Sequence, residues 1–256
     1  MAVDLAMRFL GVGNASAHAL GNASAVLERG GPPLLMIDCG PLALPSFDAH
    51  YPEPWPANLF ITHLHMDHVG GLEALFFRRY LKRAEGDAVR LFVPTHLIHP
   101  LHMKLANTTH AVSEGGVNWW DVFQLVPVHD GFWLDGLWFR VFPVRHFAPL
   151  SAFGLALPGA FVYTGDTRPI PEVISAQASG GEVIFHDTDL KGNPAHSGVD
   201  ELLAEYAPDQ IARLMAYHYA TYEEAEAIRE KGVKVVPRGE PIPLPAPAGQ
   251  AQPLPA

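Results

Sequence analysis

The chain has 256 residues, 48% of them hydrophobic, which is enough for a full core, and its length favours a single domain. Its formal net charge of −10 offers no positive field to a polyanion, so we expect no binding of long nucleic acid. A single cysteine, Cys39, excludes an internal disulfide framework and a cysteine-rich zinc module, and favours a reducing, cytoplasmic compartment.

A first strand is expected near the N-terminus. This segment does not resemble a signal peptide, because it has an acidic residue at Asp4, no basic cluster and only a short apolar run. Short runs rich in β-branched and aromatic residues predict further strands. The predicted strands span residues 7–11, 24–28, 33–38, 58–62, 89–93, 123–128, 132–134, 137–144, 160–165, 181–187 and 214–218. No apolar run is long enough to span a bilayer, so we expect no membrane partner.

Helices are expected between some of these strands. The clearest covers residues 72–80, where apolar side chains recur on one helical face. Weaker candidates span residues 95–105, 169–178, 198–206 and 222–231. Consecutive early strands followed by interspersed helices suit two mixed sheets that pack face to face and are flanked by helices.

The last twenty residues or so differ in composition from the rest. From Pro237 onward Pro and Ala dominate and charge is almost absent, so this stretch cannot build a core and favours extended conformations. We therefore expect a catalytic domain over residues 1–236 and a flexible or surface-draped tail over residues 237–256.

The segment from residue 61 to residue 71 carries four metal-binding side chains between an apolar strand and a predicted helix: His63, His65, Asp67 and His68. His63 and His65 flank one residue, so in an extended chain they point to the same side and can bind one ion together. Asp67 and His68 turn into the helix start and can bind a second ion about 3.5–4 Å from the first, as in two-metal hydrolases. These ligands suit zinc, with iron or manganese as alternatives.

This segment, THLHMDHVGG, resembles the HxHxDH signature of the metallo-β-lactamase superfamily, and later segments follow that family's order over residues 7–236. The resemblance implies a four-layer αββα sandwich with a dinuclear metal site, and it places Asp38 behind the motif as a support. It also supplies three more ligands, namely His146, Asp166 in YTGDTR and His218 in LMAYHY. The first ion would then be bound by His63, His65 and His146, and the second by Asp67, His68 and His218, with Asp166 bridging both.

A later segment, FHDTDLKGNPAHSGVDEL, resembles the ribonuclease Z-like branch, whose His-acid and His-Ser motifs match Asp187 and His196. A histidine beside a dinuclear centre can protonate a leaving alkoxide, and we assign this role to His196, with His186 as the alternative. Only about twenty residues separate His146 from Asp166, so the long arm that transfer-RNA-processing members carry there is absent.

Three other groups of residues are candidates for lesser roles. Phe132 and the tryptophans at 119, 120, 133 and 138 can wall a pocket that stacks a base or ring, although aromatic residues in strands more often belong to a core. Arg140, Arg145 and Arg168 are candidates for contact with a substrate phosphate. We expect Cys39 to pack as a small buried residue without a catalytic role.

Together these features predict a cytoplasmic enzyme, a hydrolase with two divalent metal ions, zinc above all, that cleaves a small phosphodiester of the cyclic or short nucleotide type. A hydroxide bridging the ions attacks phosphorus, and Asp67 helps to orient it. Lactone and thioester hydrolases share the ligand set and stay open as an alternative, as does a non-hydrolytic diiron protein that binds oxygen or acts in redox chemistry. Superfamily members often pair through their surfaces, so a homodimer is a prior expectation.

Overall fold

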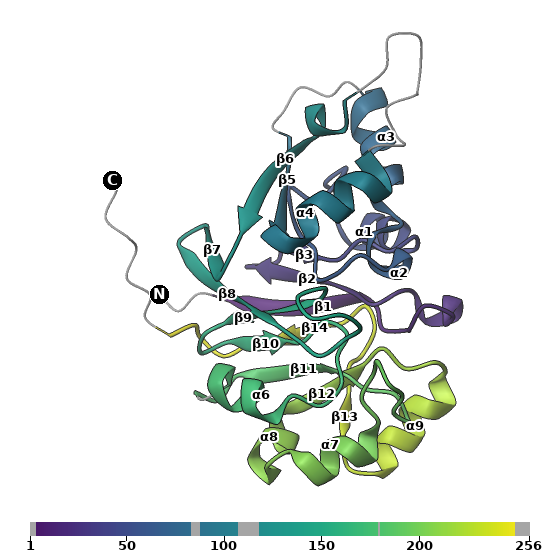
Figure 1. The fold of residues 1–256 in the computed structure, drawn as a ribbon, viewed down its shortest axis with the longest axis vertical. Coiled ribbons are helices and arrows are strands. Elements are labelled where there is room, and N and C mark those ends of the chain that lie inside the picture. Colours follow the sequence, from purple (N-terminus) through teal and green to yellow (C-terminus); the bar gives the residue numbers. More distant parts are fainter. Residues whose placement is uncertain (1–3, 83–87, 107–117, 179, 249–256) are drawn as a thin grey trace.

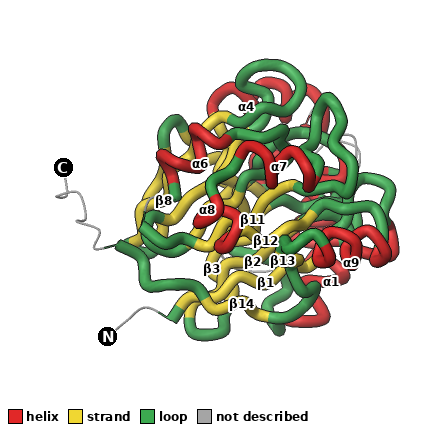
Figure 2. Tube along the Cα trace, turned by 90° about the horizontal axis from the view of Figure 1, so that it is seen from below, coloured by secondary structure: helices red, strands yellow, loops and turns green. Residues whose placement is uncertain are grey.

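Two seven-stranded β-sheets pack face to face in the computed structural model, which describes residues 4–82, 88–106, 118–178 and 180–248. Helices lie on the outer side of each sheet, so that the described residues form four layers (Figure 1). A view turned by 90° shows the strands in the middle of the molecule and the helices around them (Figure 2). The predicted αββα sandwich with two mixed sheets is confirmed.

The first sheet comes from the N-terminal half of the chain, with one strand added from the C-terminal end. Its strands are, in spatial order, β14 (Pro241–Pro243), β1 (Leu5–Gly11), β2 (Ser24–Arg29), β3 (Pro33–Ile37), β4 (Asn58–Phe60), β5 (Val89–Pro94) and β6 (Phe123–Val128). The pairs from β14 to β3 are antiparallel, and those from β3 to β6 are parallel. Its helices are α1 (Ala43–His50), α2 (Met66–Val69), α3 (Leu72–Lys82) and α4 (Thr95–Leu101), which continues into the π-helical turn η2 (His102–Ala106).

The second sheet repeats this plan. Its strands are, in spatial order, β13 (Lys234–Val235), β12 (Leu214–Tyr217), β11 (Val183–Asp187), β10 (Phe161–Tyr163), β9 (Phe153–Leu157), β8 (Leu137–Pro143) and β7 (Gly131–Leu134). The pairs from β13 to β10 are parallel and the rest are antiparallel. Its helices are α6 (Pro171–Gln177), α7 (Val199–Glu205), α8 (Pro208–Arg213) and α9 (Tyr222–Glu230), and two short 3-10 turns, η1 (His18–Leu20) and η3 (Trp119–Asp121), complete the elements.

Aromatic side chains fill the space between the two sheets. The ring of Phe9 on β1 lies 5.2 Å from that of Phe185 on β11, 5.3 Å from that of Tyr217 on β12 and 5.9 Å from that of Tyr163 on β10, measured between centroids. All four side chains are fully buried. Such residues bury about 150–250 Å² each and dominate core energetics, so this cluster holds the parallel strands of the second sheet against β1.

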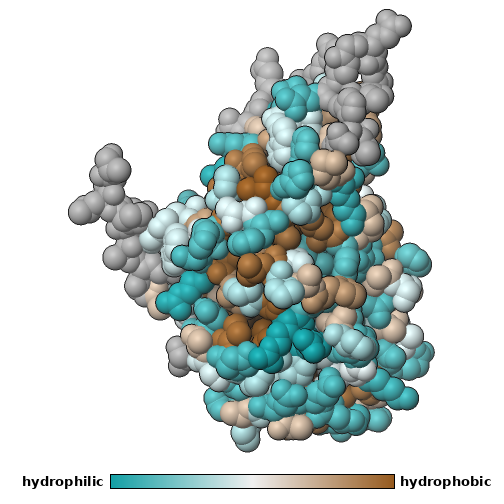
Figure 3. Space-filling view, viewed as in Figure 1, coloured by the Kyte–Doolittle hydropathy of each residue, from teal (hydrophilic) through white to brown (hydrophobic). Residues whose placement is uncertain are grey.

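Hydrophobic side chains also reach the surface. On the face shown in Figure 3 they gather toward the middle of the molecule, and the lower edge is mainly hydrophilic. None of the helices in the described ranges combines the length and apolar character that a membrane span requires.

All predicted strands are present, but the sequence did not predict β9, β13, β14, α1 or α8. Strand β9 reads FGLAL and is buried throughout, so it lacks the alternation and the β-branched residues that signal a strand. Helix α8 begins with Pro208, and proline is favoured at the first helical position. The helix has only six residues, however, which is too short for a periodic apolar pattern.

The described part of the predicted tail lies on the surface, at the edge of the first sheet, and is ordered by it. Strand β14 pairs with β1 in antiparallel register, and the Ala248 amide donates a hydrogen bond of 2.8 Å to the Pro158 carbonyl. Proline is tolerated in a strand at the edge of a sheet, where one side of its backbone needs no partner. The folded unit therefore extends beyond residue 236 to residue 248, and residues 249–256 lie outside the described ranges.

Candidate metal centre

The HxHxDH segment takes the local conformation that its spacing predicts. After β4 the backbone stays extended through His65, whose φ and ψ are −68° and 151°, and α2 begins at Met66. The extended part therefore presents His63 and His65, and the first turn of α2 presents Asp67 and His68. The carboxyl end of a parallel strand is where α/β proteins place their ligand sites.

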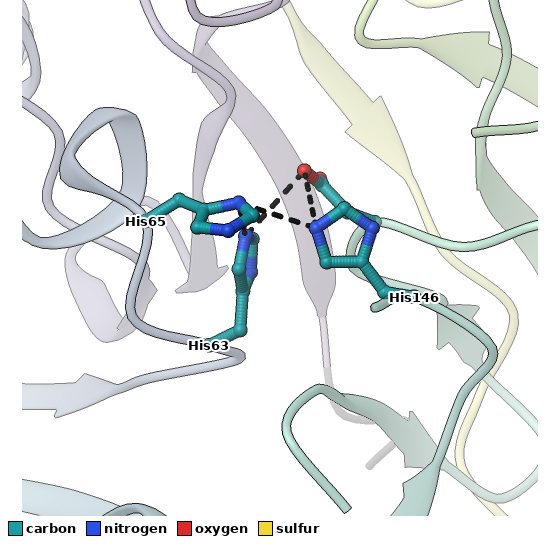
Figure 4. A group of neighbouring side chains, drawn as sticks. His63, His65 and His146 are labelled. Atoms are coloured by element: carbon teal, nitrogen blue, oxygen red, sulfur yellow. Dashed lines mark hydrogen bonds and ion pairs between the residues drawn. The ribbon is translucent and has the colours of Figure 1, made fainter. Parts of the chain in front are cut away.

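A first cluster gathers His63, His65, His146 and Asp166, whose ligand atoms all lie within 4.8 Å of one another. His65 Nδ1 lies 3.1 Å from His63 Nε2 and 3.2 Å from His146 Nε2. The three imidazole rings point toward one another from two different loops (Figure 4). His146 comes from the loop after β8, so the second sheet contributes to a site that begins on the first.

A second cluster gathers Asp67, His68, Asp166 and His218, again with ligand atoms within 4.8 Å of one another. His68 Nε2 lies 3.3 Å from Oδ2 of Asp67 and 3.3 Å from Oδ2 of Asp166, and His218 Nε2 lies 3.3 Å from the same oxygen of Asp166. Asp166 belongs to both clusters. Its side chain is 1% exposed, so the residue that the two clusters share is buried.

The side chains of the two clusters, and the buried polar atoms among them that lack a hydrogen-bond partner, suit the binding of divalent cations. His68 Nε2 and Asp166 Oδ1 are buried and have no hydrogen-bond partner among the described residues. A buried polar atom without a partner costs about 1–3 kcal/mol, and metal coordination would remove that cost. Five histidines and two aspartates are ligands that zinc, iron and manganese accept.

The supporting contacts orient the ligand rings. Asp38 is fully buried and accepts hydrogen bonds from the Thr62 amide at 2.8 Å and the Thr62 hydroxyl at 2.6 Å, and its Oδ2 lies 2.8 Å from His68 Nδ1. His146 Nδ1 lies 3.0 Å from the Ala195 carbonyl oxygen. With Nδ1 engaged, each ring turns Nε2 toward the clusters, which is the usual way of fixing a metal-binding imidazole.

Two residues of the centre have strained backbone. Asp38 has a φ of 59° and His218 a φ of 75°, in the left-handed region that residues other than glycine rarely adopt. Such strain costs about 1–3 kcal/mol per residue and gathers at functional sites. Here the strain accompanies one side chain that orients a ligand and one that belongs to the second cluster.

The charges of the site differ between the two clusters. Burial lowers the pKa of His63, His65 and His146, which keeps these rings neutral and able to bind a cation. Burial also acts on His68 and His218, but the Asp166 carboxylate outweighs it and raises the pKa of both rings well above its usual value. Around Asp166 the fold therefore favours positive charge, as a cation site requires.

Asp67 remains ionised in this environment. Burial raises the pKa of its carboxyl group, but the nearby rings of His218 and His68 outweigh burial and lower this pKa far below its usual range. At 9% exposure the Asp67 side chain is the least buried member of the second cluster. It is thus an anionic group at the boundary between the cluster and the cavity in front of it.

The two candidate proton donors have different surroundings. His196 Nδ1 lies 2.8 Å from Oδ2 of the buried Asp187, and the ring lines a cavity of about 220 Å³ together with Asp67, Asp166 and His218. His186 is fully buried, with Nδ1 2.7 Å from the Asp187 carbonyl oxygen and Nε2 2.8 Å from the Tyr206 hydroxyl. The geometry therefore brings His196 to the centre and leaves His186 in the structural core.

The structure also reveals cavity residues that the sequence analysis did not assign. Asn14, Ser16, Asp189 and Asn193 line the same cavity as His196. Burial, together with the Asp187 charge, raises the pKa of Asp189 to about 6. The Gly13–Ala17 stretch carries turn residues just after β1, but nothing local in it indicates that this turn lies over the metal-binding clusters.

Two of the lesser candidates make structural contacts away from the two clusters, and a third is buried. Trp119 is buried and stacks on Phe76 at 5.3 Å between ring centroids, so it belongs to the core. The Arg145 guanidinium pairs with Glu172 at 2.7 Å. Burial raises the pKa of the Cys39 thiol to about 12, which keeps it protonated and unreactive, in agreement with the predicted packing role.

Comparisons with known proteins identify the family and the fold of this chain. The sequence profile of Anti-Pycsar protein Apyc1 matches residues 5–242, and a protein of that name from Paenibacillus harenae is 31% identical over 204 residues, covering 77% of this chain and 83% of the relative. Among solved structures, the metallo-β-lactamase fold protein YhfI from Bacillus subtilis superposes with a TM-score of 0.73 at 14% identity, covering 94% of this chain and 99% of YhfI. A diphosphatase of the PhnP family superposes with a TM-score of 0.74 at 17% identity, covering 96% of this chain and all of the other. The chain therefore has the metallo-β-lactamase fold and belongs to the Anti-Pycsar protein Apyc1 family.

Proposed function

We propose that this chain is a metal-dependent phosphodiesterase that hydrolyses a small phosphodiester of the cyclic or short nucleotide type. The observation that carries the proposal is the position of Asp166, which is shared by two buried clusters of histidine and aspartate. Family membership supports the same assignment. The short connection between His146 and Asp166 leaves out the arm that transfer-RNA-processing members use, which favours a small substrate.

Each of the seven side chains has a role in this proposal. His63, His65 and His146 would hold the first ion, and Asp67, His68 and His218 would hold the second, with Asp166 shared by both. Two divalent ions in such a site lower the pKa of a bound water and polarise a phosphoryl oxygen. The nitrogen-rich donor set favours zinc over iron or manganese. The ionised Asp67 carboxylate orients the attacking water from the boundary of the cavity.

His196 supplies the proton to the leaving alkoxide. Its Nδ1 is engaged by Asp187, so Nε2 is the atom left for the substrate. Burial lowers the pKa of His196, but the hydrogen bond and the charge of Asp187 outweigh burial and raise it above its usual value. A raised pKa keeps the ring protonated near neutral pH, which a general acid requires.

The test of this function is turnover of bis(p-nitrophenyl) phosphate by protein loaded in turn with zinc, manganese or iron, with His65→Ala as the control. We expect turnover that depends on metal and is lost in the control variant. Turnover with a metal would justify a screen of cyclic and short nucleotides. The absence of turnover with every metal would overturn the proposal. It would favour lactone or thioester hydrolysis and, after that, diiron redox chemistry.

Replacing His196 with alanine is expected to lower kcat by about a hundred- to ten-thousandfold, the usual contribution of a positioned acid or base. Metal content should not change, because His196 is outside the proposed ligand set. Wild-type turnover should fall as pH rises through the raised pKa of His196, and the variant should lack this alkaline limb. The matched control is His129→Ala, a histidine whose side chain is 77% exposed. A His196→Ala protein with unchanged kcat and bound metal would contradict the assignment.

A cytoplasmic location and a homodimer stay predictions from the sequence. Size-exclusion chromatography with light scattering at several protein concentrations would measure the assembly directly.

A further inference from the structure

A second cavity opens beside the first metal-binding cluster, and His196 is not among its lining residues. Its volume is about 400 Å³, within the range of roughly 300–1,000 Å³ typical of small-molecule sites. His63, His65 and His146 form the wall that it shares with the cluster. The rest of the wall is mostly apolar, with Leu64, Leu97, Pro100, Phe147, Ala148 and Leu150 in it. We call this cavity the apolar pocket.

Phe147 stands at the edge of the apolar pocket with most of its ring in solvent. Its exposed fraction is 68%, the highest of the large hydrophobic residues among the described parts of the chain. The ring lies edge-on to His146 and His65, at 4.5 Å and 5.0 Å between centroids. A phenylalanine held in this way forgoes the gain from burial, and an aromatic face open to solvent next to a catalytic centre can stack on a planar ligand.

Leu150 supplies an independent observation. Four residues other than glycine have positive φ in the described part of the chain: Asp38, Asp135, Leu150 and His218. Asp38 and His218 serve the metal centre, and Asp135 precedes Gly136 in the hairpin turn between β7 and β8. Leu150, with a φ of 60° and 42% exposure, has neither explanation. Glycine would relieve the strain, so the leucine indicates that its side chain is needed where it lies, in the wall of the apolar pocket.

The charge of the apolar pocket differs from that of the cavity around His196. Its described wall contains His96 and Lys104 and no carboxylate, although the whole chain has a net charge of −10. The Lys104 ammonium is held against this wall by a hydrogen bond of 2.5 Å to the Leu64 carbonyl. The cavity around His196 contains Asp67, Asp166 and Asp189. An uncharged planar group attached to a phosphate anion therefore fits the apolar pocket better than it fits the cavity around His196.

We propose that the apolar pocket binds the nucleobase of the substrate, with Phe147 stacking on the base and Leu150 packing against it. This inference rests on the proposed phosphodiesterase function and names the part of the substrate that the pocket recognises. A phosphodiester at the clusters and a base in the apolar pocket are compatible because the two sites share His63, His65 and His146 as a common wall. The contacts are apolar and sequence-tolerant, so the pocket accepts purines and pyrimidines alike.

The test compares two probes that differ only in the base. One is 3′,5′-cyclic AMP, and the other is 1-O-methylribose 3′,5′-cyclic phosphate, in which a methoxy group replaces the base. With metal-loaded Phe147→Ala we expect KM for cyclic AMP to rise by about ten- to a hundredfold, the usual effect of losing one base-stacking ring, and kcat to change little. The kinetics of the baseless probe should not change. Phe147→Trp should restore the KM for cyclic AMP.

Leu150→Gly separates the role of the side chain from the stability of the loop. Because glycine accepts the positive φ without strain, the variant should melt no lower than the wild type, and its KM for cyclic AMP should rise. The matched control is Tyr222→Ala on α9, at a residue with 57% exposure. This variant should leave KM and kcat unchanged for both probes.

Failure of this inference and failure of the proposed function would look different. Two results would overturn the proposed base pocket and leave the proposed phosphodiesterase function intact. One is wild-type protein that hydrolyses both probes with the same KM, and the other is a Phe147→Ala protein whose KM rises equally for both probes. Wild-type protein that hydrolyses neither probe and no chromogenic diester would overturn the proposed function, and the base pocket with it.

Discussion

Asp166→Ala should lose tight binding of the metal pair and reduce turnover at least about a thousandfold, since a single preorganised donor already contributes about a hundred- to a thousandfold. The reason is that Oδ2 of Asp166 lies 3.5 Å from His63 in the first cluster and 3.3 Å from His68 and His218 in the second. No other side chain of the described residues belongs to both of these groups. In the proposed ligand set its loss would remove a ligand from each ion together with the negative charge shared by the two clusters.

The measurement is metal content per chain after dialysis, by plasma mass spectrometry, alongside steady-state turnover of the chromogenic diester. The matched control is Asp189→Asn, because Asp189 lines the cavity around His196 but belongs to neither cluster. That variant should keep its metal. An Asp166→Ala protein with two tightly bound ions and full turnover would contradict the bridging role.

Asp38→Ala should lower the free energy of unfolding of the metal-free protein by about 3–5 kcal/mol. This is the usual result of removing one partner of a buried charged pair. Asp38 and His68 are both fully buried, and the same carboxylate also accepts hydrogen bonds from the Thr62 amide and hydroxyl. Without it, His68 loses the contact that turns its Nε2 toward the second cluster. Metal affinity should therefore fall by about ten- to a hundredfold as well.

Urea denaturation of the metal-free protein measures the first effect, and competition with a chromophoric chelator measures the second. Asp38→Asn is the informative control, because asparagine tolerates the positive φ at this position and keeps an acceptor for Thr62 while it removes the charge. It should lose less stability than the alanine variant. A metal-free Asp38→Ala protein as stable as the wild type would show that the buried pair does not stabilise the fold.

The parts of the fold that could be predicted are those whose signal is local. Strands such as residues 89–93 and 123–128 alternate or run apolar over five or six positions, and helix α3 shows an apolar face over three turns. Strand β9 gave no such signal, since glycine and alanine fill a place that is buried on both sides. The C-terminal strand β14 was missed because its proline-rich sequence reads as tail, and only its pairing with β1 makes it a strand.

The sequence by itself determined the first half of the candidate site. His63, His65, Asp67 and His68 lie within six residues, so the turn from an extended strand end into α2 is enough to bring them together. The other ligand positions, His146, Asp166 and His218, could be assigned only from the order of motifs in a resembling family. As single residues they carry no local signal.

Only the tertiary structure decided how the rest of the site is completed. It places His196 in the cavity and His186 in the core, and it joins Phe147 and Leu150 into a wall beside the first cluster. His65 and His146 are 81 positions apart, yet their ring nitrogens lie 3.2 Å from each other. Such contacts depend on where the loops of two packed sheets meet, and this follows from strand order and sheet packing, which hydrophobic periodicity along one segment does not encode.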